Sequence, residues 1–225
     1  EGTDITLTLT TTNATGYSWW DNFTGSKTRI YTDAIGDSTY VFWAEAVNSL
    51  GCTARDTVEV FVRSKPTVTI QPSGGNTNIC INEQATLTGP NQPGYQYQWY
   101  LNGNPAGSNS HQFSFTMLAN AEVKLKVTDS HGCSNTSSPL QLQVIDLPGI
   151  ILTPDSLSVC LGNNFTLKIN NQNVVSYSWF DGLAGHLKQR TFATDSLGVG
   201  NFIYWAEGKN AAGCVSRDTT IVKVL

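Results

Sequence analysis

Five cysteines carry the most distinctive chemistry of this 225-residue chain, because thiols can pair as disulfides, bind metals or act as nucleophiles. They are Cys52, Cys80, Cys133, Cys160 and Cys214. Their spacing is not the C-x-x-C or Cys/His spacing of a zinc site, so no metal site is expected. Cysteines at repeated positions instead favour disulfides and an oxidising, extracellular location.

No other residues combine into a catalytic pattern. The histidines do not recur from repeat to repeat, and no nucleophile elbow, zinc-protease motif or phosphate loop is present. Acidic residues do recur, at Asp21 and Asp181 and at Glu45 and Glu207. Paired carboxylates can hydrolyse glycosides, but charges on a solvated strand face account for these four. We therefore predict no enzyme and no cofactor.

An internal repeat organises the chain. The motif Tyr-x-Trp ends at Trp19, Trp99 and Trp179, each 80 residues after the one before, and VFWAEAVNSLGC at 41–52 returns as IYWAEGKNAAGC at 203–214. A period of this length indicates small tandem domains. The three tryptophans are expected to point inward, as the buried tryptophan of an immunoglobulin-like domain does.

Most segments alternate at period 2 between turn residues, which predicts an all-β chain. The expected fold is three tandem immunoglobulin-like β-sandwich domains of about 80 residues arranged as a rod. Short proline-containing links place the domains at residues 1–64, 65–146 and 147–225. Against the other copies, the first domain lacks its first strand. We therefore expect the natural chain to continue upstream of Glu1, with a cysteine directly before Glu1.

Composition limits the partners. Charged residues make up 13% of the chain and the net charge is −4, which gives no basic surface for nucleic acid or for an anionic membrane. No apolar run approaches the roughly 20 residues of a membrane span. We expect no nucleic-acid partner and no direct membrane insertion.

Two disulfide patterns are open. Bridges inside the domains would join Cys80 to Cys133 and Cys160 to Cys214, each stabilising its domain by about 4 kcal/mol. In a seven-strand sandwich, however, Cys80 precedes the second strand and Cys133 follows the parallel sixth strand. They would then lie at opposite ends of a body roughly 25 Å long, beyond disulfide reach. We favour a bridge between domains, from Cys80 to Cys214, with Cys133 reaching back to an upstream cysteine and Cys160 forward to a following domain.

Aromatic residues define a second candidate site. If Trp19 and Trp179 point inward, the next residues, Trp20 and Phe180, face outward. Trp43 and Trp205 also alternate outward on the neighbouring strand. Two outer pairs are therefore expected, Trp20 with Trp43 and Phe180 with Trp205.

These pairs have two interpretations. They can form a platform that stacks sugar rings or grips a partner. Alternatively, they are cross-strand pairs that stabilise a thin sandwich, each covered by the stem of Arg55 or Arg217.

The segments CINEQATL at 80–87 and CLGNNFTL at 160–167, with Tyr-x-Trp and the late Gly-Cys, resemble the Ig-like and PKD-like tandem repeats of Bacteroidetes surface proteins. Those proteins include gliding-motility adhesins exported by the type IX secretion system. The resemblance implies a secreted, cell-surface or filament-forming stalk. It also implies O-glycans at Asp-Ser/Thr motifs, which here would modify Ser38, Thr57, Ser156, Ser196 and Thr219.

The leading functional hypothesis is an extracellular structural or adhesive segment, a stalk or filament, of a large secreted bacterial surface protein. Its partners would be neighbouring repeats or other subunits of a fibre. The alternative is a set of carbohydrate-binding accessory modules of a secreted polysaccharide-degrading enzyme, which would bind polysaccharide through the aromatic platform.

Overall fold

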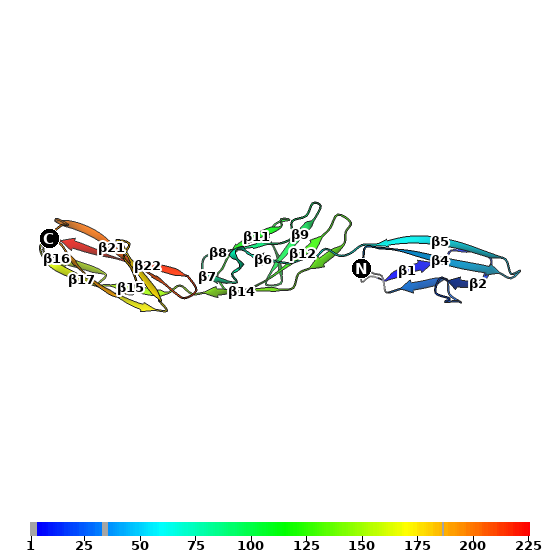
Figure 1. Ribbon diagram of the computed structural model, residues 1–225, viewed down its shortest axis with the longest axis horizontal. Coiled ribbons are helices and arrows are strands. Elements are labelled where there is room, and N and C mark those ends of the chain that lie inside the picture. The colour runs from blue at the N-terminus through cyan, green and yellow to red at the C-terminus, as the bar shows by residue number, and fades with distance from the viewer. Residues whose placement is uncertain (1–3, 33–35, 186) are drawn as a thin grey trace.

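A computed structural model describes residues 4–32, 36–185 and 187–225. Its regular structure is β-strand apart from the short 3₁₀ turn η1 (Ser73–Gly75). The strand pairs fall into three consecutive groups along the chain, which we call domain 1 (residues 1–64), domain 2 (65–146) and domain 3 (147–225). Figure 1 shows these groups as three sandwiches placed end to end with domain 2 in the middle. The expected all-β immunoglobulin-like rod is confirmed.

Domain 3 has two sheets in which most neighbouring strands are antiparallel. One has the order β15-β17-β20 and the other the order β16-β22-β21-β18-β19, in which β16 runs parallel to β22. The strands are β15 (Gly149–Thr153), β16 (Ser156–Val159), β17 (Asn164–Gln172), β18 (Ser176–Trp179), β19 (Ala184–Gly185), β20 (Gln189–Ala193), β21 (Gly200–Lys209) and β22 (Val215–Val224).

Domain 2 repeats this plan. Its sheets have the orders β11-β8-β6 and β10-β9-β12-β14-β7, with β13 also paired to β12 and β7 parallel to β14. The strands are β6 (Gln71–Pro72), β7 (Asn78–Cys80), β8 (Gln84–Thr88), β9 (Gln96–Leu101), β10 (Asn104–Ala106), β11 (Gln112–Thr116), β12 (Ala121–Thr128), β13 (Ser134–Thr136) and β14 (Leu140–Ile145).

Domain 1 has fewer strands in the part that the structure describes. Its sheets have the orders β1-β3 and β2-β4-β5. The strands are β1 (Ile5–Thr8), β2 (Ala14–Trp19), β3 (Thr28–Tyr31), β4 (Ser38–Asn48) and β5 (Thr53–Val62). Among these described residues, nothing corresponds to the edge strands β15 and β16 of domain 3.

The repeated tryptophans form the centre of each core, as expected. Trp19, Trp99 and Trp179 are 3%, 0% and 1% exposed. Each indole N–H donates to a backbone carbonyl, at Ser26, Ser110 and Leu187 respectively. A buried indole needs such a partner because an unpaired N–H would cost about 1–3 kcal/mol.

The strand after the tryptophan strand turns one face inward. Phe42, Val123 and Tyr204 occupy equivalent buried positions, as do Ala44, Leu125 and Ala206. Domains 2 and 3 surround these positions with large buried clusters. In domain 1, by contrast, only Trp19, Phe42 and Ala44 are fully buried hydrophobic residues among those described.

Candidate functional site

A disulfide from Cys80 to Cys214 closes the junction between domains 2 and 3 (S–S 2.06 Å, Cα–Cα 5.6 Å). Cys80 ends β7 and pairs with Ile145 at the end of β14, from which the chain leaves domain 2. Cys214 lies in the turn between β21 and β22. Cys133 and Cys160 are free thiols, so the favoured bridge between domains is present and the pairing inside each domain is not.

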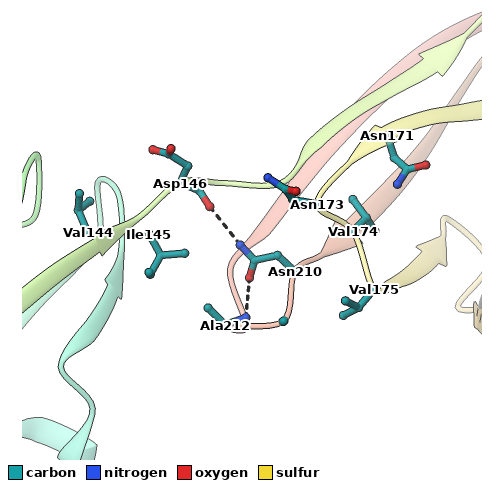
Figure 2. Close-up of a pocket in the computed structure, with 10 residues that line it drawn as sticks. Val144, Ile145, Asp146, Asn171, Asn173, Val174, Val175, Asn210 and Ala212 are labelled. Carbon is teal, nitrogen blue, oxygen red and sulfur yellow. Dashed lines mark hydrogen bonds between the residues drawn. The ribbon is translucent and has the colours of Figure 1, made fainter.

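Asn210 builds the turn that carries Cys214. Its Oδ1 accepts hydrogen bonds from the backbone N–H groups of Ala212 (3.0 Å) and Cys214 (2.9 Å). Gly213 completes the turn at a φ of 95°, where glycine is favoured. Asn210 Nδ2 donates to the backbone oxygen of Asp146 in the linker (3.1 Å), as Figure 2 shows. One side chain therefore shapes the turn and ties it to the neighbouring domain.

The same turn recurs in the other domains. Asn48 Oδ1 accepts the N–H of Cys52 (3.0 Å), and Asp129 Oδ1 accepts that of Cys133 (2.9 Å). Cys52 is exposed and Cys133 is partly exposed. The β4–β5 turn lies at the free end of domain 1 in Figure 1. The disulfide partners expected for Cys133 and for the exposed Cys160 remain predictions.

Both linkers are bound by the residue two positions after the turn cysteine. Asn135 Nδ2 donates to the backbone oxygen of Pro66 (3.0 Å), and Ser216 Oγ donates to that of Pro148 (2.5 Å). Both junctions therefore have a side-chain hydrogen bond to a backbone oxygen of the linker. The junction between domains 2 and 3 has the disulfide in addition.

An open pocket of about 660 Å³ lies beside the disulfide-linked junction between domains 2 and 3. Domain 2 contributes Val144 and Ile145, and domain 3 contributes Val174, Val175 and Ala212 (Figure 2). At its rim, the Asn210 amide is bonded to the backbone oxygen of Asp146 and to its own turn. The pocket thus marks the seam between two domains.

The outer tryptophans are covered by arginines. The Arg55 guanidinium lies 3.9 Å from the Trp43 ring centroid and 3.2 Å from Glu45. Domain 3 repeats the arrangement, with Arg217 3.9 Å from the centroid of Trp205. The Arg217–Glu207 ion pair measures 3.0 Å. An arginine held on an indole face by a carboxylate is a stabilising surface stack.

The expected pairing of Trp20 with Trp43 is wrong. Trp20 packs on the buried Phe42, with centroids 4.5 Å apart, and on Tyr31 at 6.4 Å. The reason is that β2 ends at Trp19, so Trp20 already lies in a turn and strand alternation no longer applies to it.

Phe180 departs from the expectation for the same reason, because β18 ends at Trp179. Its ring contacts the buried Tyr204 at 4.7 Å and Phe192 at 5.4 Å. Neither expected outer pair is formed, and the four residues do not make a continuous platform.

The repeated acidic residues hold arginines. Asp21 lies 2.6 Å from Arg29, and Asp181 lies 2.7 Å from Arg190. The hydrogen bonds from these guanidinium groups lower the pKa of both carboxyls below its usual value. Carboxylates kept ionised in this way act as structural anchors. Among the residues that the structure describes, no three His, Cys, Asp or Glu side chains gather as a metal site.

The glycan expectation falls on surface positions. Thr57, Ser156, Ser196 and Thr219 are exposed, whereas Ser38 is half-buried and its hydroxyl donates to the Gly36 oxygen (3.4 Å). Modification of these five residues remains a prediction.

The match to a protein family points to the same fold for residues 148–225. Residues 148–225 match the family described as Ig-like domain CHU_C associated. The chain is similar to titin domains I67–I69 (14% identity, 99% of this chain and 91% of that one, TM-score 0.43). It is also similar to the N-terminal eight Ig domains of DSCAM (16% identity, 100% and 35%, TM-score 0.49). A third similar structure is a Bacteroides ovatus mixed-linkage glucan utilization protein, SGBP-B, in complex with a heptasaccharide (14% identity, 99% and 63%, TM-score 0.22).

No curated protein matches the chain. Within the described residues, no helix is long and apolar enough to cross a membrane. Residues 148–225 are thus an Ig-like domain similar to the CHU_C-associated family, and the chain as a whole is a tandem Ig-like β-sandwich protein.

Proposed function

We propose that this chain is an extracellular structural segment, a stalk or filament element, of a large secreted bacterial surface protein. The observation that carries the proposal is the disulfide between Cys80 and Cys214, which joins two sandwiches across their linker. An extracellular, oxidising location is where such a bond persists. The family matched by residues 148–225 and the resemblance to Bacteroidetes repeats support the same location.

The disulfide between Cys80 and Cys214, which we call the staple, limits how domains 2 and 3 move relative to one another. A single linker would let domain 3 swing about residues 146–148. The disulfide provides a second covalent connection, and the Asn210 and Ser216 hydrogen bonds provide polar contacts to the linker. Two covalent connections at one junction resist bending, which a stalk requires to hold a distal module away from the cell.

The staple also limits extension under force. Cys80 and Cys214 are 134 residues apart in sequence, so pulling on the chain ends cannot extend the residues between them while the bond is intact. A fully extended chain spans roughly 3.3–3.6 Å per residue. The disulfide therefore withholds about 440–480 Å of contour length from an applied load.

Single-molecule pulling on the oxidised chain tests this function. We expect the total extension to increase by about 450 Å after reduction or in Cys214→Ser. Cys133→Ser is the matched control, because that thiol takes no part in the bridge, and it should leave the extension unchanged. Equal extensions for the oxidised chain and Cys214→Ser would show that the staple bears no load and would remove the basis of the stalk proposal.

A further inference from the structure

Domain 1 contains an open groove between its two sheets. The groove encloses about 260 Å³ and is lined by Leu7 and Leu9 from the β1 side, Trp19, Phe42 and Ala44 from the core, and Val58 from β5. Thr6, Thr8, Asp56 and Thr57 line it as well, so the groove combines apolar side chains with groups that can form hydrogen bonds.

The equivalent groove in domain 3 is filled by the chain itself. Strand β15 lies against β17 and buries Leu152 completely. The Leu152 backbone N–H donates to Asp218 Oδ2 (2.8 Å) on β22. Strand β16 then pairs in parallel with β22 from Ile221 to Val224. The segment Gly149–Val159 thus closes both sheets of the sandwich.

Domain 1 keeps the residues that would receive such a segment. Asp56 occupies the position of Asp218, and its Oδ1 accepts the N–H of Thr57 (2.8 Å) as Asp218 Oδ1 accepts that of Thr219 (2.8 Å). Within the described residues, nothing corresponds to the Leu152 N–H that Asp218 Oδ2 receives.

Equivalent aliphatic side chains are less buried in domain 1 than in domain 3. In domain 3, Leu167, Ile169, Val222 and Val224 are 0%, 4%, 0% and 0% exposed. The equivalent residues of domain 1, Leu7, Leu9, Val60 and Val62, are only half-buried. Two pairs of aliphatic side chains, one pair facing the groove from each sheet, therefore gain burial if an extended strand covers them, and the burial of apolar area favours binding.

We propose that this groove binds an extended strand with the chemistry of Gly149–Cys160. Such a strand would donate a backbone N–H to Asp56, place an aliphatic side chain in the cavity, and pair in parallel with β5 from Glu59 to Val62. A partner strand of this kind binds by main-chain hydrogen bonds with side-chain pockets for specificity. A second copy is not the expected donor, because its own Gly149–Cys160 segment is held in its domain 3 with Leu152 buried.

The position of Cys133 indicates, independently of the groove, where such a strand would end. In domain 2 the strand that pairs in parallel, β7, ends at Cys80, and that cysteine bonds the turn cysteine of the next domain, Cys214. Cys133 occupies the same turn of domain 2 as Cys214 does of domain 3, and Asn135 beside it binds the linker from domain 1. A strand in the domain 1 groove that ends in cysteine would bring that cysteine to Cys133. This inference rests on the fold and does not depend on the stalk proposal.

The test uses the full 225-residue chain and a synthetic peptide, GIILTPDSLSVC, whose cysteine carries a thiopyridine group. The Cys133 thiolate attacks the peptide sulfur, forming a protein–peptide disulfide and releasing thiopyridone, so no added oxidant is needed. We expect labelling at Cys133 about tenfold faster than with a scrambled peptide that keeps the terminal cysteine, because docking raises the local concentration. Labelling of the exposed Cys52 and Cys160 should be equal for the two peptides.

Variants locate the binding to the groove. A peptide with Asp in place of the fourth residue, the counterpart of Leu152, should lose the preference for Cys133. Asp56→Ala should reduce it several-fold, whereas Glu59→Gln should not, because the domain 3 equivalent of Glu59 is the exposed Ile221. Circular dichroism checks that each protein variant is folded. Hydrogen exchange with a peptide that has serine for cysteine should protect the β5 amides at 59–62.

Two results would overturn the proposal. One is labelling of the three thiols at the same relative rates by the native-sequence, aspartate and scrambled peptides. The other is a concentration-dependent dimer, formed without peptide, that protects the same β5 amides, since the occupant would then be a second copy.

Discussion

At the scale of single residues, the outer tryptophans show how a surface aromatic can be structural. Trp43 and Trp205 each carry an arginine at 3.9 Å, and each arginine is held by a carboxylate on the same strand as its tryptophan. A sugar ring would have to displace the guanidinium before it could stack on the indole. The arrangement therefore accounts for these residues without a glycan.

Substitution at Trp205 separates the two interpretations. Trp205→Ala should lower the stability of domain 3 by about 1 kcal/mol, since the cation–π stack and part of the packing are lost, and denaturant unfolding would measure it. In affinity electrophoresis through polysaccharide gels, wild type and variant should migrate equally. Retardation of the wild type that Trp205→Ala abolishes would instead support the carbohydrate-binding alternative.

Asp181 gives a prediction with a defined pH direction. Its pKa is lowered in the folded protein by the hydrogen bond from Arg190, so its contribution to stability is complete above the pKa of the unfolded chain and is lost as pH falls through the folded value. Because the carboxyl is 38% exposed, the contribution is about 0.5 kcal/mol.

Asp181→Asn should therefore unfold more easily than wild type at pH 7, and the difference should vanish near pH 2. Urea unfolding at the two pH values measures this. A difference of equal size at both would mean that the charge is not responsible. Asp195→Asn, at an exposed position, is a suitable control.

At the scale of elements, the repeated β-turn unites local shape with assembly. Asn210 supplies two acceptor contacts inside its turn and one donor contact to the linker. In domain 2, two residues have these roles separately: Asp129 accepts the hydrogen bonds of the turn, and Asn135 donates to the linker. This difference permits a clean separation of the two roles.

Asn210→Asp should keep the turn, as Asp129 does, and lose only the bond to Asp146. Asn210→Ala should lose both and destabilise the junction by about 1–3 kcal/mol, because two backbone N–H groups lose their partner. Thermal unfolding of domain 3 would rank wild type, Asn210→Asp and Asn210→Ala in falling order. The same alanine change at the exposed Asn48 turn should leave domain 3 unaffected. If the two Asn210 variants were equally unstable, the linker bond rather than the turn would be the main contribution.

Much of the element arrangement could be predicted from the sequence. The 80-residue spacing identifies Trp19, Trp99 and Trp179 as equivalent. If one of them is buried in its core, the other two are expected to be buried as well. The bridge from Cys80 to Cys214 followed from strand directions in a sandwich, since the ends of successive domains meet at the linker.

Other features depend on where a strand stops, which alternation does not reveal. Trp20 and Phe180 turn inward because their strands end one residue earlier, and a period-2 pattern contains no signal for that position. The Asp-Asn/Gly turn residues after them, Asp21-Asn22 and Asp181-Gly182, were the available hint. The open groove of domain 1 could be inferred as a missing strand, but not as a cavity lined by particular side chains.

At the scale of the whole molecule, the three domains differ in completeness. Domains 2 and 3 have large buried cores, whereas domain 1 leaves β5 with Val58 and Phe61 45% and 51% exposed. An unpaired edge of this kind invites pairing with another strand. Among the described residues, the rod therefore has one disulfide-linked part, domains 2 and 3, and one domain in which β5 is an unpaired edge strand.

The bridge from Cys80 to Cys214 also sets an order of events in time. A chain made from its N-terminus presents Cys52 and Cys80 first, then Cys133 and Cys160, and only last Cys214, the correct partner of Cys80. Before folding, Cys52, Cys133 and Cys160 are therefore all nearer to Cys80 in sequence than Cys214 is. Once domain 2 has folded, Cys80 lies beyond the Ala121 end of β12 and Cys133 follows its Thr128 end, so the length of the strand separates the two thiols, and the linker brings Cys214 into reach. Oxidation that precedes folding would trap the wrong pair, so the sandwich itself selects the disulfide that later secures it.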